Sequence, residues 1–182
     1  MLTPDPNPDN RIHPSVTIIR PAQPSDLSGI TRIFNHAITH TTASFYGQPR
    51  TVEQRRDWLV DREPRYAVLV ADFQQTTAGW IALDPFSEKE GYRITTEISY
   101  YVDPNFQGQG IGKSLLDHSL RIASENGFRN ILAKICEDNL ASLKLATQFG
   151  FHRVGTLKSI GYKFGRHYDV HIYQKEIATA ST

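Results

Sequence analysis

The sequence has a single cysteine and no long hydrophobic run. Because Cys136 has no second cysteine to pair with, no internal disulfide can form, which is typical of a reducing compartment, and we expect a cytoplasmic location. No apolar stretch approaches the roughly 18 residues of a membrane helix. The N-terminus also lacks the basic region and apolar core of a signal peptide, so we expect no membrane partner. Cys136 ends an apolar run and is interpreted as a small buried hydrophobic residue rather than a nucleophile.

An excess of either charge is also lacking. The chain has 20 Lys and Arg against 19 Asp and Glu, a formal net charge of +1, so we expect no nucleic-acid partner. At 182 residues, of which 39% are hydrophobic, it suits one α/β domain with a substantial core. Metal ligands are sparse too. His36 and His40 have i, i+4 spacing on a predicted helix, but no third ligand is evident in the sequence, and we expect no metal.

Four prolines among Asp and Asn residues predict a flexible N-terminal tail over residues 1–14, followed by a single domain over residues 15–182. Ser25 is predicted to cap a first helix, and Thr51 with Gln54 forms a capping box for a second. Two further helices are expected to end at about Gly127 and Gly150. Strands are predicted over residues 16–20, 67–71, 79–83, 95–102, 130–136, 151–157 and 168–177. This order predicts an α/β fold with a mixed central sheet and helices on both faces.

Residues 107–114 are a glycine-rich segment between a predicted strand and a predicted helix. Three alternate glycines allow a sharp turn, and the free amides and dipole of the helix N-terminus favour phosphate. A P-loop would need glycine where Gln107 stands. A dinucleotide fingerprint that begins at Gly108 would need glycine where Lys113 stands. The segment is therefore interpreted as a pyrophosphate cradle of another kind.

The pattern Gln107-x-x-Gly110-x-Gly112 resembles the acyl-CoA-binding loop of the GCN5-related N-acetyltransferases. Other stretches resemble one branch of that family, the phosphinothricin or methionine sulfoximine N-acetyltransferases, over roughly residues 16–177. They are Ile19-Arg20-Pro21-Ala22, Phe34-Asn35-His36-Ala37-Ile38, Glu90-Gly91-Tyr92-Arg93, Asn139-x-x-Ser142, Phe149-Gly150-Phe151 and Gly161-x-Lys163-Phe164-Gly165-Arg166. The resemblance implies the acyl-CoA N-acyltransferase fold, acetyl-CoA as co-substrate and a homodimer.

The resemblance also implies direct transfer of an acetyl group, within a ternary complex, to the amine of a small amino-acid-like substrate such as phosphinothricin or methionine sulfoximine. Two alternatives remain. One is an acetyltransferase for another small amine or for a protein N-terminus, and the other is a CoA-binding sensor without catalysis. The implied cofactor-binding residues are Tyr100, Tyr101, Val102, Gln107, Gly108, Gln109, Gly110, Ile111, Gly112, Lys113, Asn139 and Ser142.

Glu97 is the predicted catalytic base, because an ammonium group must lose a proton before it can attack a thioester. Side chains alternate along a strand, so Glu97, Ser99 and Tyr101 share one face of the strand over residues 95–102. A partly buried carboxylate there suits a base that acts through a water. The alternative is a structural glutamate paired with a nearby arginine.

The departing thiolate calls for an acid, and relatives carry Tyr or His at the position that is Ala146 here. The acid must then be another group or solvent, and Tyr101, Tyr168 and Tyr173 are eligible. For the substrate, the resemblance points to Glu90, Gly91, Tyr92 and Arg93, with Phe45 as an apolar wall. Arginine can bind a carboxylate or phosphinate through two hydrogen bonds. Lys163 and Arg166 are further candidates.

Overall fold

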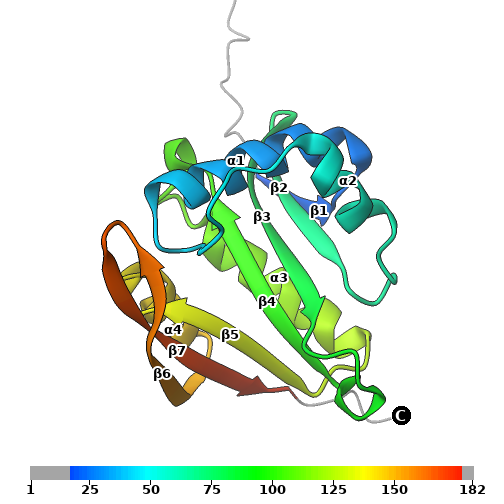
Figure 1. Cartoon of the computed structure of the whole chain (residues 1–182). Helices are drawn as coiled ribbons and strands as arrows, with labels where there is room; N and C mark the ends of the chain where they lie inside the picture. Colours follow the sequence, from blue (N-terminus) through cyan, green and yellow to red (C-terminus); the bar gives the residue numbers. More distant parts are fainter. Residues whose placement is uncertain (1–16, 178–182) are drawn as a thin grey trace, which may run out of the picture.

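A seven-stranded sheet with the strand order β1-β2-β3-β4-β5-β7-β6 forms the centre of the molecule (Figure 1). The computed structural model describes residues 17–177, so the tail predicted over residues 1–14 lies outside the described residues. The strands are β1 (Ile18–Pro21), β2 (Val68–Phe73), β3 (Thr76–Pro85), β4 (Thr95–Val102), β5 (Asn130–Cys136), β6 (His152–Lys163) and β7 (Arg166–Glu176). The helices are α1 (Leu27–His40), α2 (Val52–Val60), α3 (Ile111–Glu125) and α4 (Leu140–Gln148).

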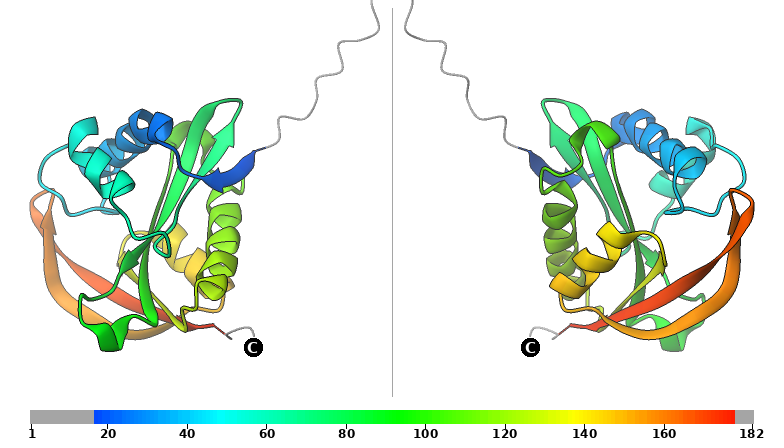
Figure 2. Two further views of the ribbon diagram at one scale, coloured as in Figure 1. Left: turned by 90° about the vertical axis from the view of Figure 1, so that its right-hand side faces the viewer. Right: turned by 90° about the vertical axis from the view of Figure 1, so that its left-hand side faces the viewer.

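Helices cover both faces of the sheet, as predicted. α1 and α2 lie on one face, and α3 and α4 lie on the other (Figure 2). On the first face α1 buries Ile30, Ile33 and Phe34 against Val70 and Trp80. On the second face a larger cluster joins α3 to β3, β4 and β5, with members that include Leu115, Leu116, Ile81, Ile98 and Ile131. Two hydrophobic layers therefore hold the strands in place from either side.

β4 and β5 form the parallel pair of this mixed sheet, and their pairing is short. It runs over three residue pairs and ends at Glu97 and Leu132. β4 continues beside β3 as far as Val102, whereas β5 turns away with β7 as far as Cys136. The two strands separate beyond that point, as Figure 1 shows. Residues 98–102 therefore have a free backbone edge that faces the opening.

The helix starts were predicted with mixed success. Thr51 and Gln54 form the expected capping box, with Gln54 N 3.2 Å from Thr51 Oγ1 and Thr51 N 3.0 Å from Gln54 Oε1. The prediction that Ser25 caps the first helix was wrong. Ser25 lies inside the 3₁₀ turn η1 (Pro24–Asp26), which forms a capping box between Gln23 and Asp26.

The last hairpin is longer than predicted. Residues 158–163 continue β6, and the connection to β7 is a tight turn in which Gly165 has a φ of 78°. Gly161 falls between the two predicted strands, over residues 151–157 and 168–177, but lies within β6. A Cβ atom at this glycine would lie 2.4 Å from Cε1 of Phe45. Gly161 is thus a site of close approach within a strand rather than a turn signal.

Candidate active site

Two cavities lie where β4 and β5 separate. The first has a volume of about 810 Å³ and extends over the start of α3, and the second, of about 730 Å³, extends over β5 and the β6–β7 hairpin. Six residues line both cavities, which are therefore adjoining: Thr42, Ala43, Tyr100, Tyr101, Asn139 and Ser142. A molecule held in the first cavity can reach the second only past these residues.

The glycine-rich segment forms one wall of the first cavity. Gly108 and Gly110 have φ values of 75° and 81°, which a residue with a Cβ adopts only at a cost, and Gly110 is the N-cap of α3. Apart from the adjacent residues, no atom lies within 4 Å of the Cβ position at either glycine, so the backbone here borders open space. The predicted residues of the segment that line the cavity are Gln107, Gly108, Gly110, Ile111, Gly112 and Lys113. The first turn of α3 thus presents N–H groups and a positive dipole end to the cavity.

Gln109 is the member of the predicted set that does not line either cavity. Its side chain turns back and donates to Asn105 O at 3.3 Å. Gln107 donates to Val102 O at 3.5 Å, which ties the segment to the end of β4. Residues 100–102 also line the first cavity, and their contact with a cofactor stays a prediction.

Asn139 and Ser142 belong to the start of α4 and line both cavities. Asn139 is the N-cap of the helix, and its Oδ1 accepts a hydrogen bond from Ser142 N at 3.2 Å. Asn139 thus caps α4, and contact of either residue with a cofactor stays a prediction.

Glu97 lines the second cavity, and its carboxylate is ion-paired with Lys134 at 2.8 Å. The side chain of Glu97 is 26% exposed, so the group is half-buried and still open to the cavity. Ser99, two residues along the same face, donates to Asp84 Oδ2 at 3.3 Å. The alternative predicted for Glu97 was an ion pair with an arginine, and the partner found is a lysine on β5.

The tyrosines eligible as acids occupy different places. Tyr101 donates a hydrogen bond to Ala43 O at 3.3 Å, and burial raises the pKa of its hydroxyl well above the usual range. Tyr168 is buried on the wall of the first cavity, with the Arg166 guanidinium 4.1 Å above its ring. Tyr173 lines neither cavity, and Ala146 is buried in the core.

Residues 41–46, here called the strap, cross the gap between β4 and the β6–β7 hairpin. The Lys163 ammonium donates to Thr41 O at 2.5 Å, to Ser44 O at 2.6 Å and to Ala37 O at 3.5 Å. Burial lowers the pKa of Lys163. Lys163 was predicted as a substrate contact, but its hydrogen bonds go to the strap and to the end of α1.

Asp138 anchors the strap from the other side. Thr42 donates a hydrogen bond to this carboxylate, and the Arg166 guanidinium lies 3.5 Å from it. Hydrogen bonding from Thr42 and the charge of Arg166 outweigh partial burial, which acts in the opposite direction, and lower the pKa of Asp138. Arg166, the second basic candidate for substrate binding, is thus also engaged in holding the strap.

Phe45 is the predicted substrate residue that the structure places in a cavity. It lines the second cavity, where its ring packs beside Gly161 and 6.1 Å from the Tyr168 ring. The remaining four predicted residues, Glu90, Gly91, Tyr92 and Arg93, line neither cavity.

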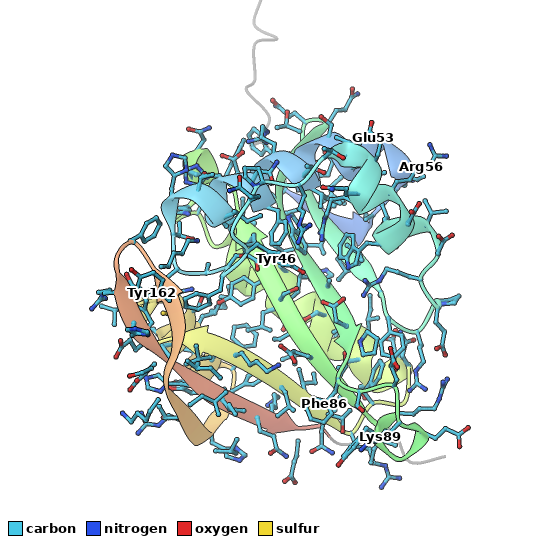
Figure 3. All side chains as sticks on the ribbon, in the orientation of Figure 1. Tyr46, Glu53, Arg56, Phe86, Lys89 and Tyr162 are labelled. Carbon is cyan, nitrogen blue, oxygen red and sulfur yellow. The ribbon has the colours of Figure 1, made fainter. Side chains whose placement is uncertain are left out.

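These four residues lie in and after the 3₁₀ turn η2 (Glu90–Tyr92), before the start of β4. Tyr92 packs against Phe86 with ring centroids 5.3 Å apart, and Arg93 is ion-paired with Glu63 at 2.6 Å. Figure 3 shows Phe86 and Lys89 at the opposite end of β4 from Tyr46. The geometry of one chain therefore does not support a substrate role for this segment.

Two groups in the second cavity were missed by the sequence reasoning. Lys134 reaches Glu97 because β5 runs parallel to β4, and the register of that pair decides which side chains meet. Tyr46, in the strap, packs edge-on against Phe34 with ring centroids 5.5 Å apart, and Arg50 lies 4.3 Å above its ring. A polar-aromatic run between helices was the available signal for Tyr46, whereas Lys134 had none without the strand register.

The stacked rings of His36 and His40 lie 4.4 Å apart on the wall of the first cavity. Among residues 17–177, no group of three His, Cys, Asp or Glu side chains is arranged to hold a metal ion. Cys136 is buried, and burial raises its pKa, in keeping with the predicted role as a small core residue. Within the same residues no helix has the length and apolar character needed to cross a bilayer.

Comparison with known proteins gives one consistent result. A profile described as the Acetyltransferase (GNAT) family matches residues 31–151. The chain is 32% identical over 163 residues to a phosphinothricin N-acetyltransferase of Streptomyces coelicolor, covering 87% of this chain and 95% of the relative. It is also 32% identical over 160 residues to an L-methionine sulfoximine/L-methionine sulfone acetyltransferase of Salmonella typhimurium, covering 87% and 94%.

Solved structures agree with the sequence relatives. An acetyltransferase of Salmonella typhimurium, solved with its cofactor acetyl-CoA, superposes with a TM-score of 0.86 at 31% sequence identity. The match covers 91% of this chain and 96% of that one.

Proposed function

This chain belongs to the acetyltransferase (GNAT) family and is an acetyl-transferring enzyme, and we propose that it moves the acetyl group of acetyl-CoA to the amine of a small amino-acid-like substrate. Phosphinothricin and methionine sulfoximine are the proposed representatives of that class. The single observation that carries the proposal is the junction of the two cavities at the point where β4 and β5 separate. One cavity offers a phosphate cradle, and the other offers the Glu97 carboxylate.

Acetyl-CoA occupies the first cavity in this proposal. The amides of residues 108–113 hold the pyrophosphate, because uncovered N–H groups at a helix N-terminus bind anions. The free edge of residues 100–102 pairs with the amide groups of the pantetheine arm, like an added strand. Asn139 and Ser142 contact the cofactor from the start of α4. The thioester then lies at the six residues that line both cavities.

The amine occupies the second cavity and attacks the thioester directly in a ternary complex. Glu97 accepts a proton from the ammonium group through a water, after which the neutral amine is the nucleophile. Lys134 orients the carboxylate through their ion pair at 2.8 Å. A backbone N–H near Tyr101 or Val102 stabilises the oxyanion of the tetrahedral intermediate. The protein need supply no nucleophile of its own.

The walls of the second cavity suit a short substrate with a polar end. Phe45, Tyr46 and Tyr162 offer aromatic surface, and Lys134 offers positive charge. The strap closes one side of the cavity, held by Lys163 and Asp138. The functions of the relatives support a free amino acid analogue over a long peptide as the substrate.

We also propose a homodimer in the cytoplasm. Large apolar side chains on the β6 edge support self-association, because Ile160, Tyr162 and Phe164 are each at least 58% exposed. Light scattering of the purified chain measures the oligomeric state, and a monomer at all concentrations would contradict this part of the proposal.

A panel of free amino acids and analogues, with thiol release from acetyl-CoA as the readout, tests the function. Methionine sulfoximine and phosphinothricin come first, with an N-terminal peptide amine as the competing class. Faster turnover of the two analogues than of the peptide supports the proposal, and the reverse order favours acetylation of a protein N-terminus. Tight acetyl-CoA binding without turnover of any amine would instead identify a sensor.

A further inference from the structure

Acetyl transfer as proposed leaves one proton without a donor. When the carbon–sulfur bond breaks, the departing CoA thiolate must be protonated. Ala146, on α4, has a buried methyl group with no proton to give. The inference below rests on the proposed function and concerns the residue that supplies this proton.

The bond that breaks must lie where the two cavities meet, since one holds the cofactor and the other the amine. The residues that line both are Thr42, Ala43, Tyr100, Tyr101, Asn139 and Ser142. Within this set only the two phenols have a proton that can be transferred to a thiolate at moderate cost, because aliphatic hydroxyl and amide groups are far weaker acids. The donor is therefore sought between Tyr100 and Tyr101.

The two tyrosines point to opposite faces of β4, because side chains alternate along a strand. Tyr101 faces α1, where its ring packs 5.2 Å from Phe34 and 4.8 Å from Trp80. Its hydroxyl is already donated to Ala43 O at 3.3 Å, and the strap covers it. The Tyr101 hydroxyl is thus already engaged in a hydrogen bond, on the face of the sheet opposite the cradle.

Tyr100 faces α3 and α4, the side on which the cradle lies. Its Cε2 atom is 3.8 Å from the Cβ position of Gly112, in the first turn of α3. Ser142, at the start of α4, lines both cavities together with Tyr100, and hydrogen bonding with its side chain acts to lower the pKa of the Tyr100 hydroxyl. The Tyr100 ring therefore lies beside the first turn of α3, and Tyr100 lines both cavities.

We propose that Tyr100 donates the proton to the departing thiolate and that Ser142 stabilises the phenolate that results. As the tetrahedral intermediate collapses, the electron pair of the carbon–sulfur bond passes to sulfur, and the Tyr100 O–H proton passes with it to give free CoA thiol. The Ser142 O–H then donates to the Tyr100 phenolate. Solvent in the cavity returns a proton to Tyr100. The substrate ammonium loses two protons in total. One of them balances the proton that Tyr100 gives to the thiol and recovers from solvent, and the other is released to solvent.

Ordinary acid–base behaviour fits this role. Burial raises the pKa of the Tyr100 hydroxyl, and the Ser142 hydrogen bond lowers it in part. The donor form is therefore populated across the neutral range, as a general acid requires.

The test is the Tyr100→Phe variant, which keeps the ring and removes only the hydroxyl. Single-turnover rates of acetyl transfer to methionine sulfoximine are expected to fall about a hundredfold, the usual share of one general acid. The Kd for acetyl-CoA, from isothermal titration, is expected to stay within about twofold because no cofactor contact is lost. Tyr173→Phe is the matched control, since Tyr173 lines neither cavity, and it should keep the parent rate.

The Ser142→Ala variant distinguishes proton donation by Tyr100 from a purely structural role of Tyr100. Removing this hydroxyl should lower the parent single-turnover rate severalfold and should add nothing in a Tyr100→Phe background, because the two groups act as a unit. Hydrolysis of bound acetyl-CoA breaks the same bond and gives a second rate that needs no amine.

A Tyr100→Phe variant with the parent rate, or with acetyl-CoA binding weakened in proportion to its rate, would overturn the inference and leave the proposed function intact. Additive losses in the double variant would overturn the pairing with Ser142. If the parent neither acetylates an amine nor hydrolyses bound acetyl-CoA faster than solution, the proposed function fails and the inference with it.

Discussion

The carboxylate of Glu97 and the ammonium of Lys134 lie 2.8 Å apart. Glu97 pairs with Leu132 at the point where β4 and β5 separate, and Lys134 lies two residues farther along β5. The pair joins the last shared residue of β4 to the diverging part of β5. Both residues line the second cavity, in which the amine is proposed to bind.

Substituting Glu97 with Gln keeps the size of the side chain and removes its ability to accept a proton. We expect kcat to fall by about 10²–10⁴, the range of a general base, with the Kd for acetyl-CoA unchanged. The measurement is steady-state turnover beside calorimetric binding. Glu88→Gln, in the exposed loop before β4, is the control and should behave as the parent. Unchanged kcat in Glu97→Gln would exclude Glu97 as the base.

Gly110 tests the cradle. Its φ of 81° makes any residue with a Cβ unfavourable by about 1–2 kcal/mol, and the added methyl would occupy open space beside the first cavity, where the pyrophosphate is proposed to bind. Gly110→Ala should weaken acetyl-CoA binding at least about tenfold, the loss of roughly one good hydrogen bond. Gly127→Ala is the matched control because Gly127 has a φ of 77°, is equally uncrowded and lies at the far end of α3.

The comparison of those two variants separates strain from binding. Both should lose similar stability in thermal unfolding, and only Gly110→Ala should lose affinity. Equal affinities in the two variants would mean that the cradle does not hold the cofactor.

A substitution at Gly161 tests the packing of the strap, through Phe45, against β6. A Cβ at this position would lie 2.4 Å from the Phe45 ring, so Gly161→Ala must displace that ring. We expect a loss of about 1–3 kcal/mol in the free energy of unfolding, as for other overpacked sites, and a higher KM for the amine with little change for acetyl-CoA. Gly155→Ala, in the same strand with open space around it, should change neither quantity. A parent-like KM in Gly161→Ala would show that Phe45 does not shape the amine site.

Lys163 tests the strap itself. Lys163→Met keeps the length of the side chain and leaves the carbonyls of Thr41 and Ser44 without their donor. Unpaired buried carbonyls cost about 1–3 kcal/mol, which chemical denaturation can measure, and a looser strap should raise the KM for the amine. Lys158→Met, on the same strand as Lys163, is the control: it removes the ion pair of an exposed lysine with Asp169 of β7 and should cost less than about 1 kcal/mol.

Much of the fold could be predicted because the relevant signals are local. β4 and β5 begin and end at the predicted residues, and the capping box of Thr51 and Gln54 marks the start of α2. Gly161 misled the prediction because glycine in a sequence signals a turn and a close approach equally well. Only the fold shows that the ring of Phe45, more than 100 residues earlier in the sequence, occupies the space that a side chain at Gly161 would need.

The site was predicted where it depends on one contiguous segment and missed where it depends on strand register. The cradle is a single run of sequence, so its residues could be named in advance. The partner of Glu97 and the phenol of Tyr100 could not, because each depends on which elements lie opposite β4. Tyr92 and Arg93 were chosen because they are near Glu97 in sequence. That same nearness places them before the start of β4, at the opposite end of the strand from the strap.

Asp26 is expected to make the fold sensitive to acid. Its carboxylate is buried, accepts hydrogen bonds from Arg20 at 2.7 and 2.9 Å and accepts another from Gln23 N at 2.7 Å. Burial alone would raise the pKa of Asp26, but these hydrogen bonds and the arginine charge lower it below the ordinary value. With a lowered folded-state pKa, the stabilisation is fully present above the unfolded value of about 3.9 and is lost as pH falls through the folded value.

Asp26→Asn should therefore destabilise the protein by about 2 kcal/mol at neutral pH, because the amide cannot accept all three hydrogen bonds and leaves the Arg20 charge poorly paired. The difference from the parent should shrink as pH falls below about 4, where the parent carboxylate also becomes protonated. Urea unfolding at several pH values measures both effects. Asp117→Asn, which removes an exposed i, i+4 pair with Arg121, should cost less than about 0.5 kcal/mol at every pH. A constant difference between Asp26→Asn and the parent from neutral to strongly acidic pH would mean that Arg20 and Asp26 contribute through packing rather than through charge.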